Sequence, residues 1–154
     1  MAMAFICALN GDSDFCAYLC ETGLKQYPMN EFMLLIRNEG DGKAAMSPEQ
    51  HLEFVKKCED YIGILQKVGR LVAAQPLISE GKIISKKKGD WIESTVNTAK
   101  EIQVGYYHIR ADTIEDAIMI AKGNPEFEYV ANASIEVRPV KSKEDKTGYL
   151  YPKG

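Results

Sequence analysis

Apolar residues recur every three or four positions along two segments of the chain, which predicts two amphipathic helices. The first begins after Ser47, the N-cap; Pro48 occupies the first turn and Gln50 completes a capping box. It is expected to end at Gly69. Its apolar face holds His51, Phe54, Val55, Cys58, Tyr61, Ile62 and Leu65. The opposite face is mainly charged, as expected for a helix that covers a sheet.

The second helix follows a strand directly. Residues 102–110 are rich in aromatic and β-branched residues, which favour a strand. Asp112 is the predicted N-cap of the helix, with Glu115 as its capping-box partner. The helix should end at Gly123, because Asn124-Pro125 prevents it from restarting. Its predicted apolar stripe consists of Ile114, Ala117, Ile118 and Ala121.

Short apolar or alternating runs predict the remaining strands, at 32–37, 71–74, 82–85, 91–94 and 133–140. The first is expected to be central and buried on both faces. The third and fourth should form a hairpin that turns at Lys88-Gly89. The order is strand, helix, strand, hairpin, strand, helix, strand. It predicts an α+β fold of the ferredoxin-like βαββαβ plan with an inserted hairpin. Two helices cover one face of such a sheet, so a homodimer is expected to cover the other.

Composition narrows the class of protein. The chain has 154 residues, 45% hydrophobic and 27% charged, which suits one globular domain. Its net charge of −3 argues against nucleic-acid binding. No run reaches the roughly 18 apolar residues that cross a membrane. Four cysteines without a CxxC pair suggest free thiols, and hence a cytoplasmic protein.

The two ends of the chain differ from residues 29–140. Residues 1–28 are either an upstream extension that is disordered or artefactual, or a genuine leading arm. The tail at 141–154 is polar and expected to be mobile.

Residues 29–140 resemble the YCII-related proteins, in the branch named for an Asp-Gly-Pro-Phe motif. The resemblance rests on four segments in the same order: 29–37, Lys100-Glu101, Gly105-Tyr106-Tyr107 and 136–140. It implies a dimeric α/β barrel, the fold of a superfamily that includes muconolactone isomerases and small monooxygenases. The naming motif itself is altered to Glu93-Ser94-Thr95-Val96, so the role of its aspartate would pass to Glu93.

His51 is the candidate catalytic residue. Its helical spacing places it on the apolar face with Val55 and Cys58, facing the sheet rather than water. An imidazole at a pocket rim is suited to general acid–base catalysis near neutral pH. The shorter YCII proteins resemble this chain in carrying a histidine early in this helix. The alternative is a histidine that is hydrogen-bonded at the edge of the core.

The candidate ligand-binding residues are Tyr106 and His108, with Arg37 and Arg138 from neighbouring strands and Glu93. Tyr106, His108 and Arg110 alternate along one strand face, which is expected to be the open one. Arginine donors there would suit an anionic or carbonyl ligand. Alternatively, these residues form a dimer interface and pair with Glu93, Glu101 or Glu136. No metal or cofactor motif occurs in the sequence.

Two functions therefore remain. The first is a small-molecule-binding or isomerase/lyase-like dimer that acts on an oxygenated organic acid. The second is a non-catalytic dimeric module with a regulatory or interaction role. A pocket lined by both His51 and His108 would favour the first function. A filled interface with paired imidazoles would favour the second.

Overall fold

The structure is a computed structural model that describes residues 29–40, 43 and 45–152. The expectation for residues 1–28 therefore lies outside the described part of the chain.

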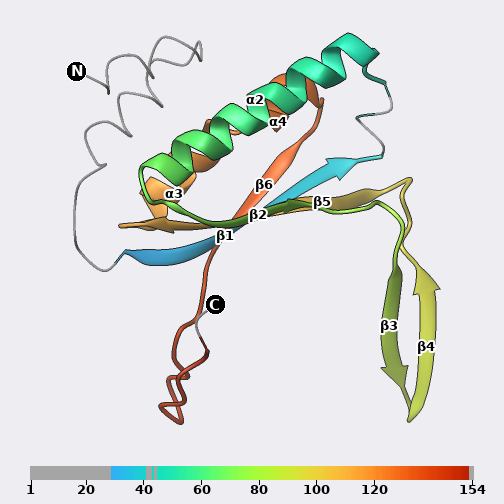
Figure 1. The fold of residues 1–154 in the computed structure, drawn as a ribbon. Coiled ribbons are helices and arrows are strands. Elements are labelled where there is room, and N and C mark those ends of the chain that lie inside the picture. Colours follow the sequence, from blue (N-terminus) through green and yellow to red (C-terminus); the bar gives the residue numbers. More distant parts are fainter. Residues whose placement is uncertain (1–28, 41–42, 44, 153–154) are drawn as a thin grey trace.

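The main sheet has four antiparallel strands in the order β2-β5-β1-β6 (Figure 1). These are β1 (Asn30–Glu39), β2 (Leu71–Pro76), β5 (Glu101–Ala111) and β6 (Ser134–Pro139). The structure confirms the predicted central position of β1. Each of the two central strands is longer at both ends than predicted. The residues that flank the predicted strands are mostly polar, but they still pair with the neighbouring strand.

Three helices in the described chain lie over one face of this sheet (Figure 1). They are α2 (Pro48–Lys67), α3 (Ile114–Lys122) and the short α4 (Glu126–Tyr129). The other face carries none of them. The fold is thus α+β with antiparallel sheets, as predicted. None of the described helices is both long and apolar enough to span a lipid bilayer.

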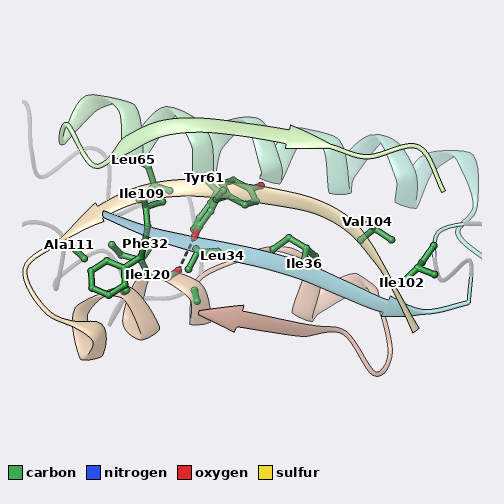
Figure 2. Packing of buried hydrophobic residues seen from close by; sticks show 13 residues of the cluster. Phe32, Leu34, Ile36, Tyr61, Leu65, Ile102, Val104, Ile109, Ala111 and Ile120 are labelled. Atoms are coloured by element: carbon green, nitrogen blue, oxygen red, sulfur yellow. Dashed lines mark hydrogen bonds between the residues drawn. The ribbon is translucent and has the colours of Figure 1, made fainter. Parts of the chain in front are cut away.

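The core lies between the helices and the sheet (Figure 2). Phe32, Leu34 and Ile36 of β1 point into it and are buried, whereas Met33 and Leu35 between them are partly exposed. The expectation that this strand is buried on both faces is therefore wrong for the single chain. Alternate residues of a strand point to opposite faces, and only one face has helices to cover it.

The structure confirms the predicted start of α2. The Ser47 side chain accepts a hydrogen bond from the Gln50 backbone, and the Gln50 side chain accepts one from the Ser47 backbone. The helix buries Phe54, Tyr61 and Leu65. Tyr61 also donates a hydrogen bond from its hydroxyl to the Ile120 carbonyl, with 2.8 Å between the oxygens. This bond ties α2 to α3 through the core (Figure 2).

The predicted N-cap of α3 is wrong by one residue. Thr113, not Asp112, caps the helix, and Asp116 is its capping-box partner. Two overlapping boxes are possible here, since both Asp112/Glu115 and Thr113/Asp116 have the required spacing. The Asp112 carboxylate lies 3.5 Å from the guanidinium of the buried Arg70 instead, which selects the later box.

The predicted apolar stripe of α3 is also partly wrong. Ala117, Ile120 and Ala121 are buried, but Ile114 and Ile118 are exposed. The buried face is thus rotated toward Ile120, which accepts the Tyr61 hydrogen bond.

The chain does restart as a helix after α3, contrary to the expectation. Asn124 accepts a hydrogen bond at its side-chain Oδ1 from the backbone N–H of Glu126, 2.9 Å away. Pro125 is the N-cap residue of the single turn that forms α4, and its fixed φ suits a helix start.

The predicted hairpin forms a separate sheet of β3 (Lys82–Lys87) and β4 (Asp90–Thr95). Its turn has positive φ at both Lys88 (50°) and Gly89 (100°), as a tight hairpin turn requires. The hairpin projects away from the main sheet on the side without helices (Figure 1). The C-terminal tail projects on the same side and forms a closed turn, in which Lys143 pairs with Leu150.

Candidate functional site

A cavity of about 490 Å³ lies between the first half of α2 and the sheet. Its floor comes from the end of β2 and the start of β5. Most of its wall is apolar, with contributions from Ile36, Phe54, Val55, Ile62, Leu77 and Val104. This volume lies in the range of pockets that bind small organic molecules, roughly 300–1,000 Å³.

Gly105 allows the floor of the cavity to close. A Cβ atom at this position would lie 3.2 Å from the Gln75 carbonyl oxygen and 3.4 Å from Pro76 Cα, so a larger residue would push β2 away from β5. The Leu77 backbone N–H also donates to the Val104 carbonyl at 2.8 Å. The glycine of the Gly105-Tyr106-Tyr107 segment is therefore required by a close backbone approach at the pocket.

A buried carboxylate, that of Glu126, belongs to the cavity lining. The Glu126 side chain is only 6% exposed, and its Oε1 accepts a hydrogen bond from Asn38 Nδ2 at 2.6 Å. The Lys43 ammonium lies 3.5 Å from the same oxygen and 5.1 Å from the centre of the Phe54 ring. Glu126 and Lys43 thus form an ion pair against an apolar wall.

Cys58 and Tyr107 lie beside this pair. The pKa of the Cys58 thiol is raised to about 11, mainly by burial and also by the negative charge of Glu126, while Lys43 opposes the shift. Burial is also the largest cause that raises the pKa of the Tyr107 hydroxyl, with smaller contributions from Cys58 and Glu126. Both groups therefore remain protonated near neutral pH and act as neutral hydrogen-bonding groups. Beside these neutral groups, the lining carries the charged pair of Lys43 and Glu126.

His51 lines the cavity at its rim, beside Phe54, with 6.4 Å between the two ring centres. His51 lies on the side of α2 that the spacing predicts. The prediction that it is turned away from water is wrong, because His51 is exposed. In Figure 1 the N-terminal end of α2 lies farther from the sheet than its C-terminal end, so the first turn of the helix is less covered by the strands.

The sheet separates His51 from three of the other candidates, namely His108, Arg37 and Arg138. Tyr106 contributes to the cavity lining, whereas His108, Arg37 and Arg138 belong to the open face. His108 Nε2 lies 2.9 Å from Glu31 Oε2. The two histidines therefore do not share a pocket.

The arginines of the open face pair within the chain. Arg37 Nε donates to Glu101 at 2.6 Å and Arg37 Nη1 donates to Glu136 at 3.1 Å. Arg138 lies 3.7 Å from Glu136. Glu93 is remote from both groups, on the exposed hairpin opposite Ile84. The expected partners Glu101 and Glu136 are thus found, and Glu93 pairs with neither arginine.

Sequence reasoning missed Asn38, Lys43 and Glu126. Asn38 and Lys43 fall at the end of β1 and in the following loop, where no periodicity marks them. Asn124-Pro125-Glu126 did contain a signal, since an asparagine followed by proline is a common helix start.

Within the described residues, no three histidine, cysteine or acidic side chains are placed to hold a metal ion. No protein-family model matches the chain, and no curated protein matches it either.

Proposed function

We propose that this protein binds a small oxygenated organic acid in the cavity between α2 and the sheet, as a dimeric binding protein or an isomerase- or lyase-like enzyme. One observation carries the proposal. The 490 Å³ cavity combines mainly apolar walls with the Lys43–Glu126 ion pair in its lining. A pocket of this kind suits a ligand with a hydrocarbon part and one polar head.

The placement of charge supports an acidic head group. Lys43 and the rim residue His51 both belong to the cavity lining, and both side chains carry nitrogen atoms that can donate hydrogen bonds. The Lys43 side chain is 30% exposed, so a carboxylate or carbonyl oxygen could reach it from the open part of the pocket. The hydrocarbon part would then lie along Phe54, Val55 and Ile62 on α2.

For the fold, we propose a ferredoxin-like domain of the YCII-related type. The strand order β2-β5-β1-β6 supports this, because α2 connects β1 to β2 and α3 connects β5 to β6, each across one intervening antiparallel strand. The hairpin β3–β4 is then an insertion between the second and third strands of that plan.

The dimer proposal follows from the open face. Met33 and Leu35 are partly exposed there, and the hairpin beside that face carries Trp91 at 70% exposure. An isolated two-stranded hairpin has little stability in water, so its apolar side chains need a surface to pack on. A second copy that covers the open face would provide that surface.

The binding proposal can be tested by thermal unfolding with two probes of one shape. 4-Phenylbutanoate should raise the melting temperature, whereas the neutral 4-phenylbutanamide should raise it less. A ligand at 100 times its Kd stabilises the native state by about 2.7 kcal/mol. In Lys43→Met, the preference for the acid should disappear while binding of the amide persists. No stabilisation by either probe would contradict the proposal.

The second candidate, a non-catalytic dimeric module, is favoured by a different observation. Arg37 and His108 on the open face are already paired with Glu101, Glu136 and Glu31 of the same chain. Such a face is suited to contact with another protein surface. If this is the whole function, an Ala74→Phe substitution that fills the cavity will leave assembly unchanged, and neither probe will bind the wild-type protein.

A further inference from the structure

Glu126 is more deeply buried than Glu59, the other acidic residue that lines the cavity. Its side chain is 6% exposed, whereas Glu59, the other carboxylate of the lining, is exposed. A buried carboxylate is costly unless it is hydrogen-bonded, and Asn38 supplies that bond at 2.6 Å. Asn38 itself is 1% exposed, so the pair is fixed inside the protein.

The described side chains contact only one oxygen of this carboxylate. The Asn38 hydrogen bond and the Lys43 contact both fall on Oε1. Glu126 therefore combines a fixed position in the cavity lining with a second oxygen, Oε2, that these two partners leave for a ligand.

We propose that Glu126 is a catalytic base that removes a proton from the carbon next to the carbonyl group of a bound oxo acid. The inference rests on the proposed binding function, and it adds the reaction and its substrate class. The ammonium of Lys43 lies 3.5 Å from the Glu126 carboxylate, so the two groups can contact neighbouring atoms of one small molecule. These atoms are the carbonyl oxygen and the hydrogen on the adjacent carbon.

The proposed step is balanced within the pocket. The C–H bond breaks and its hydrogen passes to Glu126 as a proton. The electron pair forms a C=C bond, and the carbonyl becomes an enolate oxygen that Lys43 stabilises by its positive charge. Glu126 then returns a proton to the same carbon, after its carboxyl proton has exchanged with water, or passes the proton to another carbon of the conjugated system. The first course exchanges the substrate hydrogen with solvent and the second isomerises the substrate, with no oxidant or reductant.

Two other acidic groups of the cavity lining, the Cys58 thiol and the Tyr107 hydroxyl, are poor candidates for the base. The thiol of Cys58 keeps its proton because burial raises its pKa to about 11, and burial raises the pKa of Tyr107 as well. Neither is an efficient base near neutral pH. Glu126 is the buried carboxylate of the lining, and it can accept a proton.

The test follows solvent deuterium into 2-oxo-4-phenylbutanoate by proton NMR, with binding measured in parallel by thermal shift. The wild-type protein should bind this probe and accelerate the loss of its C3 hydrogen signal over the rate in buffer alone. Glu126→Gln should bind the probe and lower the accelerated rate by about 10²–10⁴-fold. Glu115→Gln, an exposed carboxylate on α3 outside the cavity, should exchange at the wild-type rate.

The outcomes separate the two proposals. If wild-type protein binds the probe but exchange stays at the buffer rate, the base assignment is overturned and the binding function stands. If Glu126→Gln folds, binds and exchanges at the wild-type rate, the assignment is overturned as well. If neither this probe nor 4-phenylbutanoate binds the wild-type protein, the binding function itself fails. The wild-type measurement decides the first and third outcomes even if Glu126→Gln does not fold.

Discussion

Asn38 on the sheet and Glu126 in α4 are joined by a hydrogen bond of 2.6 Å between Asn38 Nδ2 and Glu126 Oε1. The bond crosses from the last buried position of β1 to the first residue of a one-turn helix 88 residues later. It fixes the carboxylate at the cavity wall and holds α4 against the sheet. The geometry of the proposed site thus depends on a contact that is also structural.

Replacing Asn38 with alanine should therefore destabilise the fold. The substitution leaves a buried carboxylate without its donor, which costs about 1–3 kcal/mol or more for a charged group. Denaturant unfolding measures the loss. In the double variant Asn38→Ala/Glu126→Gln the loss should be smaller than the sum of the two single losses, because the two residues contact each other. Additive losses would show that the bond does not contribute.

Tyr61→Phe should weaken the contact between α2 and α3. The substitution removes the hydroxyl that donates to the Ile120 carbonyl at 2.8 Å, and that carbonyl lies in the core. The expected loss of unfolding free energy is about 1–3 kcal/mol. Tyr149→Phe, in the exposed tail, is the matched control and should change stability by less than about 0.5 kcal/mol. Equal effects for the two variants would contradict this view of the core.

Cys58 should react slowly with thiol reagents, and a ligand should slow it further. In a variant with serine at positions 7, 16 and 20, the labelling rate should still rise with pH above 9, because burial raises the pKa of this thiol to about 11. The same pKa shift makes the free energy of unfolding depend on pH. The unfolded thiol loses its proton near pH 9 and the folded thiol near pH 11. The stabilisation from the buried neutral thiol is therefore complete below pH 9 and is lost as the pH rises from 9 to 11.

The labelling experiment also reports on the cavity, since Cys58 lines it. Saturating 4-phenylbutanoate should slow the reaction, whereas the amide should slow it less. A labelling rate that levels off below pH 9, or that the acid leaves unchanged, would contradict the described environment of Cys58.

Much of the fold was predictable from local signals. The Ser47/Gln50 box and the Lys88-Gly89 turn each depend on residues within four positions of one another, and both are confirmed. The N-cap of α3 was not predictable, because two overlapping boxes were equally good locally. The distant Arg70 decided between them by pairing with Asp112.

The site was less accessible to sequence reasoning. The side of α2 that carries His51 could be predicted from helical spacing, but not its exposure, which depends on how closely the helix lies to the sheet along its length. Placing His51 and His108 in one cavity required knowledge of which sheet face the helices cover. Asn38 and Glu126 meet only through the tertiary fold, so no spacing in the sequence links them.

The dimer should form through the open face with the help of the hairpin. Sedimentation should give twice the 17.2 kDa mass of one chain. Replacing residues 82–95 with two glycines should preserve the domain, since the Val96 backbone N–H already donates to the Gly81 carbonyl at 3.0 Å. This variant should dissociate more readily than the intact protein. A compact monomer at high protein concentration would contradict the proposed assembly.

Trp91 gives an independent readout of that assembly, because it is the single tryptophan in the sequence. Its side chain is 70% exposed in one chain. Packing on a second copy should shift its fluorescence to shorter wavelength, and dilution should reverse the shift. An emission maximum typical of a solvated indole at every concentration would show that the hairpin is not part of the interface.

The most direct test of the cavity as the binding site uses the two histidines of the chain, which lie at the cavity rim and on the open face. Proton–nitrogen NMR spectra of the imidazole rings, assigned with His51→Gln and His108→Gln, should be recorded during titration with 4-phenylbutanoate. We predict that the His51 signals shift and saturate while the His108 signals, from a ring paired with Glu31, stay in place. A saturating shift of His108 without one of His51, or no shift of either ring, would contradict the account.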